Sequence, residues 1–195
     1  MASWLSKLVG SFWSFLGQYQ KLFLRCLHLT LAALIIVQIL NSNGMGFTSS
    51  QQIRPGITTE LFTWMHISVG ITLLCLCVVL VIYCLSTRGF RYFYPYLWGD
   101  FTKIIRDIKT LTRFKLPESE PSGLATSVQG LGLGALSLVV LSGFTWFMLW
   151  RSGSAWALDM KDIHKTLTGL IEAYIIAHGG MGLIHFIKWG YSKPE

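Results

Sequence analysis

Four long apolar stretches, separated by polar and charged segments, dominate the pattern of this chain. They occupy residues of about 22–41, 61–86, 124–150 and 163–189. A helix needs about 20 apolar residues to cross the hydrocarbon core of a bilayer, and each stretch is long enough. The pattern therefore predicts an all-α fold, an integral membrane four-helix bundle over residues 21–189, with a short tail at 190–195.

The segment before the first stretch, residues 1–20, has a different pattern. Its apolar side chains recur at the spacing of one helix face, at Trp4, Leu5, Leu8, Phe12, Phe15 and Leu16. The run is too interrupted to span a membrane, and it lacks the small-residue cleavage site of a signal peptide. We expect an interfacial amphipathic helix that lies on the cytoplasmic leaflet.

The longest connection, residues 87–123, also carries a membrane signal. It begins with aromatic residues interleaved with arginine, in the order RGFRYFYPYLW. Such a mixture suits the headgroup region of a bilayer. The middle of the connection, about 99–112, predicts a short amphipathic helix on the membrane surface, which Pro117 and Pro121 would end.

Composition and charge agree with this picture and orient it. The chain is 52% hydrophobic and only 13% charged, whereas a soluble domain has about 25% charged residues. Of its sixteen Lys and Arg residues, twelve fall in residues 1–25, in the 87–123 connection and in residues 188–195, and four fall on the other side. Because basic residues accumulate on the cytoplasmic face, both termini are expected there. The net charge of +7 is thus a topology signal and gives no reason to expect nucleic-acid binding.

Small residues inside the stretches have plain structural interpretations. Four cysteines lie within apolar runs, where they act as small buried side chains: Cys26, Cys75, Cys77 and Cys84. The glycines of the GLGLG sequence at 130–134 predict close helix packing, since no strand precedes them as in a dinucleotide-binding loop.

All five histidines lie in or at the ends of the apolar stretches. Ionisable residues are rare in membrane spans, where each one is a functional hypothesis. His164 and His178 are fourteen residues apart, which brings them to one face of a helix and separates them by about 21 Å along its axis. His28 lies in the cytoplasmic half of the first stretch, and His66 lies near the outer end of the second.

Depth in the membrane therefore sorts four histidines into two pairs, His28 with His178 and His66 with His164. Two imidazoles on opposite faces of a flat cofactor are the ligands of a six-coordinate b-type haem. Zinc fits poorly, because it takes four ligands around one point. The spacing predicts two haem b groups, each bound by ligands from two helices, and four unrelated structural histidines are the alternative.

Other polar residues near these positions are weaker candidates. Arg25 could bind an inner haem propionate, and Arg54 or Lys165 an outer one, although snorkelling to the interface explains each equally well. His185 could bind a propionate or a quinone, replace His178 as a ligand, or lie among headgroups. Glu172 is either a proton relay or a hydrogen-bonded packing residue.

The sequences WMHISVGITLLCLCVVL and IHKTLTGLIEAYIIAHGGMGLIHF resemble the second and fourth helices of bacterial cytochrome b561. That superfamily includes the cytochrome b subunits of membrane formate dehydrogenase and nickel–iron hydrogenase. The 87–123 connection is longer than in the compact b561 proteins and in this respect looks more like those subunits. The family pattern of haem ligands falls on His28, His66, His164 and His178, and its trailing histidine on His185. Leu29 departs from the tryptophan that usually follows the first ligand.

The resemblance implies a multi-pass protein of the bacterial inner membrane that transfers electrons between a periplasmic redox partner and the membrane quinone pool. Its partners would be lipid, quinone and a redox protein, in a homo- or hetero-oligomer. One alternative is a stand-alone superoxide:ubiquinone oxidoreductase, aided by a positive outer surface at Arg54, Arg151, Lys161 and Lys165. Another is a structural anchor subunit without haem.

Overall fold

The computed structural model describes residues 2–191, so the part of the predicted tail beyond Tyr191 lies outside the described residues. The described chain is helical, apart from one isolated bridge between Phe47 and Ile53, and the predicted all-α class with four membrane spans is confirmed. The elements in order are α1 (Ala2–Tyr19), α2 (Leu22–Ser42), α3 (Ile57–Arg88), α4 (Phe90–Phe93), the 3₁₀ helix η1 (Pro95–Trp98), α5 (Thr102–Leu111), α6 (Leu124–Arg151) and α7 (Ala157–Tyr191).

Two of the spans begin earlier than their apolar stretches. Helix α3 begins at Ile57, directly after Gly56, whose φ of 142° only glycine adopts readily. Helix α7 begins at Ala157, after a turn in which Gly153 has a φ of 67°. The first turn of each helix contains a carboxylate, Glu60 in α3 and Asp159 in α7. Hydropathy therefore ended the predicted spans short of these residues, while the backbone continues as a helix beyond them.

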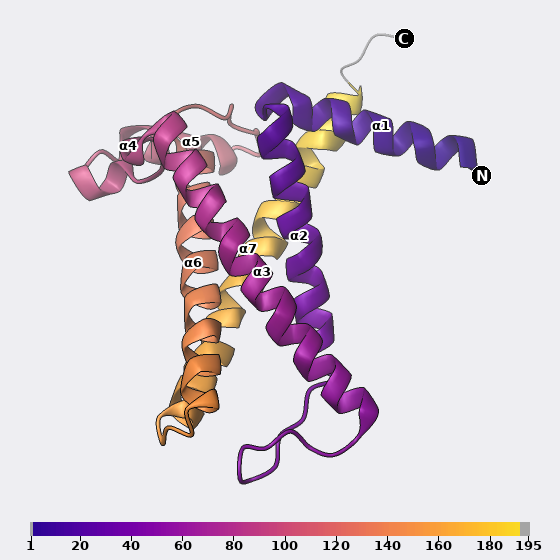
Figure 1. The fold of residues 1–195 in the computed structure, drawn as a ribbon. Helices are drawn as coiled ribbons and strands as arrows, with labels where there is room; N and C mark the ends of the chain where they lie inside the picture. The colour runs from indigo at the N-terminus through magenta and orange to yellow at the C-terminus, as the bar shows by residue number, and fades with distance from the viewer. Residues whose placement is uncertain (1, 192–195) are drawn as a thin grey trace.

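The long helices stand side by side, and the shorter ones gather at one end (Figure 1). Helix α1 extends sideways from the bundle, and α4 and η1 extend from its other side at the same end. Aromatic contacts hold the second half of α1 against the end of α7: Phe12 lies 5.4 Å from Phe186, and Phe15 lies 5.6 Å from Trp189, between ring centroids. The turns 43–56 and 152–156 lie at the opposite end.

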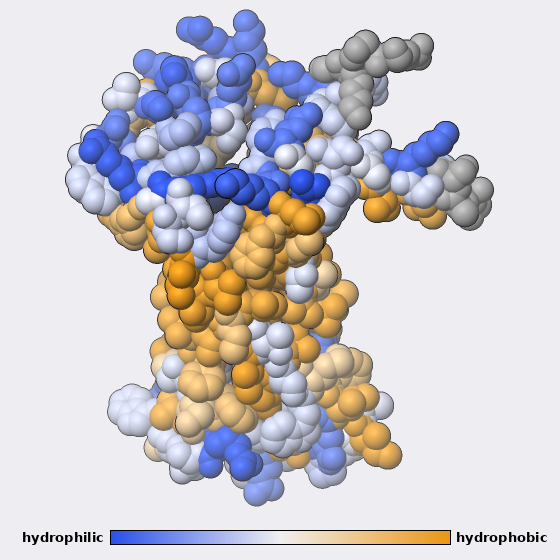
Figure 2. Space-filling model, turned by 45° about the horizontal axis from the view of Figure 1, so that its top comes forward, coloured by the Kyte–Doolittle hydropathy of each residue, from blue (hydrophilic) through white to orange (hydrophobic). Residues whose placement is uncertain are grey.

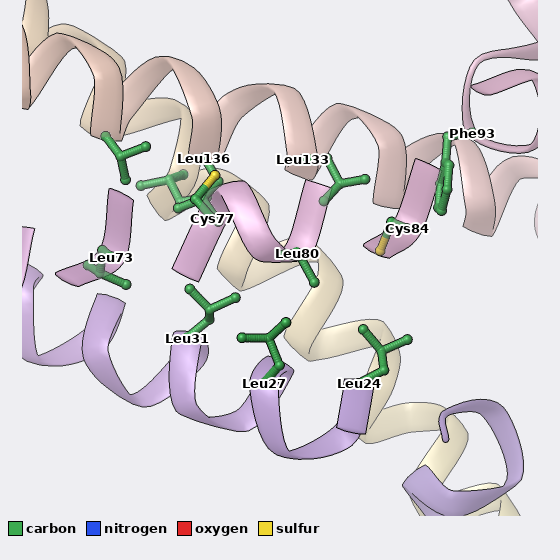
Figure 3. Packing of buried hydrophobic residues seen from close by; sticks show 12 residues of the cluster. Leu24, Leu27, Leu31, Leu73, Cys77, Leu80, Cys84, Phe93, Leu133 and Leu136 are labelled. Atoms are coloured by element: carbon green, nitrogen blue, oxygen red, sulfur yellow. The ribbon is translucent and has the colours of Figure 1, made fainter. Parts of the chain in front are cut away.

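Helix α3 occupies the centre of the packed core, between α2 and α6 (Figure 3). Leu27 and Leu31 of α2 face Leu80 of α3, and Leu133 of α6 packs from the other side. Glycine allows a close approach of α4 to α6, since a Cβ at Gly130 would lie 2.7 Å from the carbonyl oxygen of Phe93. The expected role of the GLGLG glycines in packing therefore fits Gly130, but not Gly134, which has open space around it.

The surface divides into three zones along the bundle axis. On the face shown in Figure 2, an apolar belt surrounds the middle, and hydrophilic residues gather at both ends. Four helices of the described chain are long and apolar enough to cross a membrane, namely α2, α3, α6 and α7. The exposed leucine, isoleucine and valine side chains of this belt therefore have lipid as their natural surroundings.

Candidate functional site

The structure brings the four predicted histidines together in the two predicted pairs. The ring centroids of His28 on α2 and His178 on α7 are 6.0 Å apart. Those of His66 on α3 and His164 on α7 are 6.4 Å apart. One helix, α7, thus supplies one imidazole to each pair, and the two pairs are separated by about 21 Å along its axis.

The distance within each pair fits a shared metal ion. A ligand nitrogen lies about 2 Å from its metal, and the centre of an imidazole ring lies about 1 Å behind that nitrogen, so two axial imidazoles have centroids about 6 Å apart. In the described chain no hydrogen bond joins the two rings of either pair, and their planes are steeply inclined, at 85° and 78°. The rings lie at the spacing of two axial ligands, and they do not stack.

The arrangement of the helices also fits two flat groups. Helix α7 packs extensively on α6, but it makes much less contact with α2 and α3, which carry the partner histidines. The protein buries a smaller share of the apolar window of α7 than of any other span. Within the described residues, no cluster of three or more His, Cys, Asp or Glu side chains could hold a metal ion. Each of the two histidine pairs brings two imidazole rings together.

Polar contacts orient three of the four imidazoles or their backbone. Ser142 Oγ lies 3.0 Å from Nδ1 of His164, and Gln20 Nε2 lies 3.5 Å from Nδ1 of His28. The Gln38 side-chain amide donates a hydrogen bond to the carbonyl oxygen of His66 at 2.8 Å. Nδ1 of His66 is buried without a hydrogen-bond partner.

The fourth imidazole has an aromatic neighbour. The Tyr174 ring stacks on His178 one turn away in α7, with centroids 5.0 Å apart and an angle of 8° between the planes. Gly132 of α6 makes room for this tyrosine, because a Cβ there would overlap the phenol ring. Helix α6 thus shapes the surroundings of the pair His28 and His178, although it carries no histidine.

An aromatic cluster closes the end of the bundle beyond His66 and His164, opposite to α1. Trp146 and Trp150 of α6 stack at 5.8 Å, and Phe47 meets Trp150 edge-on at 5.9 Å. The ammonium group of Lys161 lies 4.1 Å from the centroid of the Phe47 ring, and the Trp150 indole N–H donates to the Gln51 carbonyl oxygen at 2.7 Å. The 43–56 turn is thereby fastened across the ends of α6 and α7.

The three basic residues that were weaker candidates for binding a haem propionate differ in their contacts. The guanidinium group of Arg25 donates to the carbonyl oxygens of Trp13 and Gln20, at 3.1 and 3.4 Å, and lies over the Trp13 indole ring. Arg54 is exposed in the outer turn, and Lys165 forms an exposed pair with Asp162 at 3.9 Å. The haem propionate roles of these residues stay predictions.

His185 and Glu172 occupy different sides of α7. His185 is half-buried, seven residues beyond His178 and next to the aromatic residues that receive α1. Glu172 is exposed on the protein surface at membrane depth. The structure thus brings His185 to the end of α7 that packs against α1, and it leaves Glu172 away from either histidine pair.

Sequence reasoning missed the contribution of α6. A Cβ at Gly143 would lie 2.8 Å from Cε1 of His164, and the neighbouring Ser142 contacts the same imidazole. The only sequence signal was a serine and a glycine within a long apolar run, which is common in membrane helices. Gln20 was also missed, because it lies in the short break between α1 and α2.

A helical membrane bundle that pairs imidazoles from separate helices, at the spacing of axial haem ligands, defines a class: the membrane b-type cytochromes. The family model of prokaryotic cytochrome b561 matches residues 19–190, nearly the whole chain, and the chain therefore belongs to that family. Neither a curated protein nor a solved structure matched the chain. The expected family is thus confirmed, and with it a membrane protein that binds haem b and takes part in electron transfer.

Proposed function

We propose that this protein is a diheme cytochrome that transfers electrons between a periplasmic redox partner and the membrane quinone pool. The observation that carries the proposal is the presence of two imidazole pairs at two depths of one bundle. The ring centroids are 6.0 Å apart within one pair and 6.4 Å apart within the other. A single haem would leave one of these pairs without a purpose. Two haems, one at each pair, would instead let an electron cross the membrane in two shorter steps.

The protein's own residues would bind, space and orient the cofactors. His66 and His164 would hold the outer haem, and His28 and His178 the inner one. Because His164 and His178 belong to one continuous helix, α7 fixes the vertical separation of the two sites. Haem b, when bound, supplies one-electron oxidation and reduction. Reduction of one quinone consumes two electrons and two protons, and oxidation of the quinol releases them.

The orientation in the membrane follows from charge. Basic residues are concentrated at the end that carries α1, α4 and α5, which the positive-inside rule assigns to the cytoplasm. Both termini would then be cytoplasmic in the bacterial inner membrane, and His66 and His164 would face the periplasm. Helix α1, with Trp4, Leu8 and Val9 exposed, would lie on the cytoplasmic leaflet.

The quinone end is proposed at the inner pair, on the family resemblance. His185 lies on the ligand face of α7 toward the cytoplasmic end, where it could bind a quinone or a haem propionate. Arg25 lies near the same end, and Arg54 and Lys165 lie near the outer pair, where each could meet a propionate. The small outer turns would offer the periplasmic partner a compact docking platform.

Haem stoichiometry in purified protein tests the proposal. We expect a pyridine haemochrome assay to give two b haems per chain in the wild type. His66→Ala or His164→Ala should remove one haem, and His28→Ala or His178→Ala should remove the other, with a different change in the reduced-minus-oxidised spectrum. His185→Ala is the matched control on the same helix and should keep both haems.

Three outcomes would contradict the assignment. One haem or none in haem-replete wild-type protein would remove the diheme mechanism. Loss of a haem in the His185→Ala variant, with retention in His178→Ala, would make His185 the inner ligand. Identical spectra for variants of the two pairs would show that the histidines do not serve separate sites.

A further inference from the structure

Helix α6 carries no predicted haem ligand, yet it presents two consecutive residues to the imidazole of His164. Ser142 Oγ lies 3.0 Å from Nδ1 of that ring. The next residue, Gly143, has its missing side chain directed at the ring, since a Cβ there would be 2.8 Å from Cε1. Helix α6 therefore meets the Nδ1–Cε1 edge of the imidazole with a hydroxyl group and with bare backbone.

The hydrogen bonds of Ser142 decide the direction of the contact. A serine hydroxyl has one proton, and Ser142 Oγ donates it to the carbonyl oxygen of Val139 at 2.9 Å. Toward His164 the oxygen can then only accept. With the hydroxyl group in this orientation, the proton of the neutral imidazole lies on Nδ1, and Nε2 keeps its lone pair for a metal.

We propose that Ser142 is a positioning residue that fixes the tautomer and the ring orientation of His164 and thereby lowers the reduction potential of the outer haem. The inference rests on the proposed function. A ligand imidazole that donates its second N–H to an acceptor becomes a better electron donor through the other nitrogen, which favours the oxidised metal. Ser142 is only 8% exposed, so water does not readily replace it as the acceptor.

The two haem sites differ in this respect. At the inner pair, the corresponding contact is between Gln20 and Nδ1 of His28, at the longer distance of 3.5 Å. At the outer pair, Nδ1 of His66 has no hydrogen-bond partner, whereas His164 has both the Ser142 hydroxyl group and the Val139 carbonyl oxygen beside it. Loss of the Ser142 hydroxyl should therefore act on the outer haem and leave the inner haem unchanged.

Potentiometric titration of the α-bands, with EPR spectra of the ferric protein, tests the inference. We expect Ser142→Ala to keep two haems but to raise the potential of the outer one, by about tenfold in its one-electron equilibrium constant, which is about 59 mV. The EPR signal of the same haem should change, because its ligand ring is free to rotate. Ser142→Thr retains a hydroxyl group, so its outer haem should have the potential and the EPR signal of the wild type.

Ser137→Ala is the matched control. Ser137 lies in the same helix and donates to the Leu133 carbonyl oxygen at 2.8 Å, but it contacts Cys77 and not a histidine. The control should leave both potentials unchanged. If Ser142→Ala matches the wild type in potential and EPR signal, or if the control produces the same shift, the inference is overturned.

This failure is distinct from failure of the proposed function. A wild-type protein with two haems, combined with an unaffected Ser142→Ala variant, would leave the diheme assignment intact and remove only the role of Ser142. A wild-type protein without haem would remove both. If Ser142→Ala loses the outer haem entirely, the Ser142→Thr variant decides, because retention of that haem at the wild-type potential supports the hydroxyl role and its loss contradicts it.

Discussion

At the scale of single residues, the surroundings of His164 leave no space for a side chain at position 143. An added methyl group would lie 2.8 Å from the imidazole, and such overpacking costs about 1–3 kcal/mol. We expect Gly143→Ala to displace the ring and lower the occupancy of the outer haem, measured by haemochrome content and the reduced-minus-oxidised spectrum. The inner haem should be retained.

Gly134→Ala provides the comparison for this prediction. It is the same substitution in the same helix, but nothing lies within 4 Å of the added atom. The control should bind both haems as the wild type does. Equal loss of haem in both variants would point to a general effect of alanine on α6, and normal binding in Gly143→Ala would show that the ring can move without loss.

The sequence predicted which histidines share a depth, and it could not predict what holds them. A spacing of fourteen residues places His164 and His178 on one face because helix geometry is regular. The contact of Ser142 with His164 depends instead on how α6 packs against α7, which no local pattern records. The same limit applies to Gln20, whose position follows from the bend between α1 and α2.

At the scale of elements, α5 is tied to the beginning of α6 by a buried carboxylate. Asp107 is 2% exposed, and its Oδ2 accepts a hydrogen bond from the backbone N–H of Leu124 at 2.9 Å. Arg106 pairs with both Asp107 and Glu120, and Lys103 pairs with Glu120 at 3.1 Å. The 87–123 connection is thus fixed at its end, where a carboxylate satisfies the first turn of a long helix.

We expect Asp107→Ala to lower the thermal stability of the detergent-solubilised protein, because it removes a helix cap worth about 1 kcal/mol and leaves a buried N–H without a partner. Asp107→Asn should lose less, since its amide oxygen can still accept. Glu118→Ala, an exposed acidic residue of the same segment, should leave the melting temperature unchanged. Equal melting temperatures for Asp107→Ala and the wild type would contradict the role of the cap.

The helices themselves were largely readable from the sequence, but their ends were not. Hydropathy identifies the most apolar part of a helix, whereas the backbone of α7 begins at Ala157, before the charged residues Asp159, Lys161 and Asp162. Likewise α5 begins at Thr102 within the predicted range of 99–112, after a turn in which Gly99 has a φ of 71°. Turn geometry and capping set these ends, and neither contributes to an average hydropathy.

At the scale of the whole molecule, packing and function divide the four spans differently. The core is built on α3, between α2 and α6, whereas the histidine pairs are built on α7. The sequence predicted that four spans form a bundle, but not that α7 packs on α6 and makes little contact with the helices that carry its partner ligands. If haem binds at the two pairs as proposed, it would lie between α7 and these helices.

The position of the pairs leads to a prediction about sidedness. His66 and His164 lie toward the end with turns 43–56 and 152–156, and His28 and His178 lie toward the end with α1. In sealed right-side-out vesicles, a membrane-impermeant oxidant such as ferricyanide should oxidise the haem left in His178→Ala much faster than the haem left in His66→Ala. Electron tunnelling falls steeply with distance, and the pairs differ in depth by about 21 Å along α7.

Inside-out vesicles supply the control for this prediction, because the order of the two rates should reverse in them. If the rates reverse as expected, the outer pair faces the periplasm and the charge-based orientation holds. The opposite order in both preparations would place the termini in the periplasm, with the two haem sites intact. Equal rates in both preparations would mean that neither haem is nearer to one surface, which the depths of the histidine pairs do not allow.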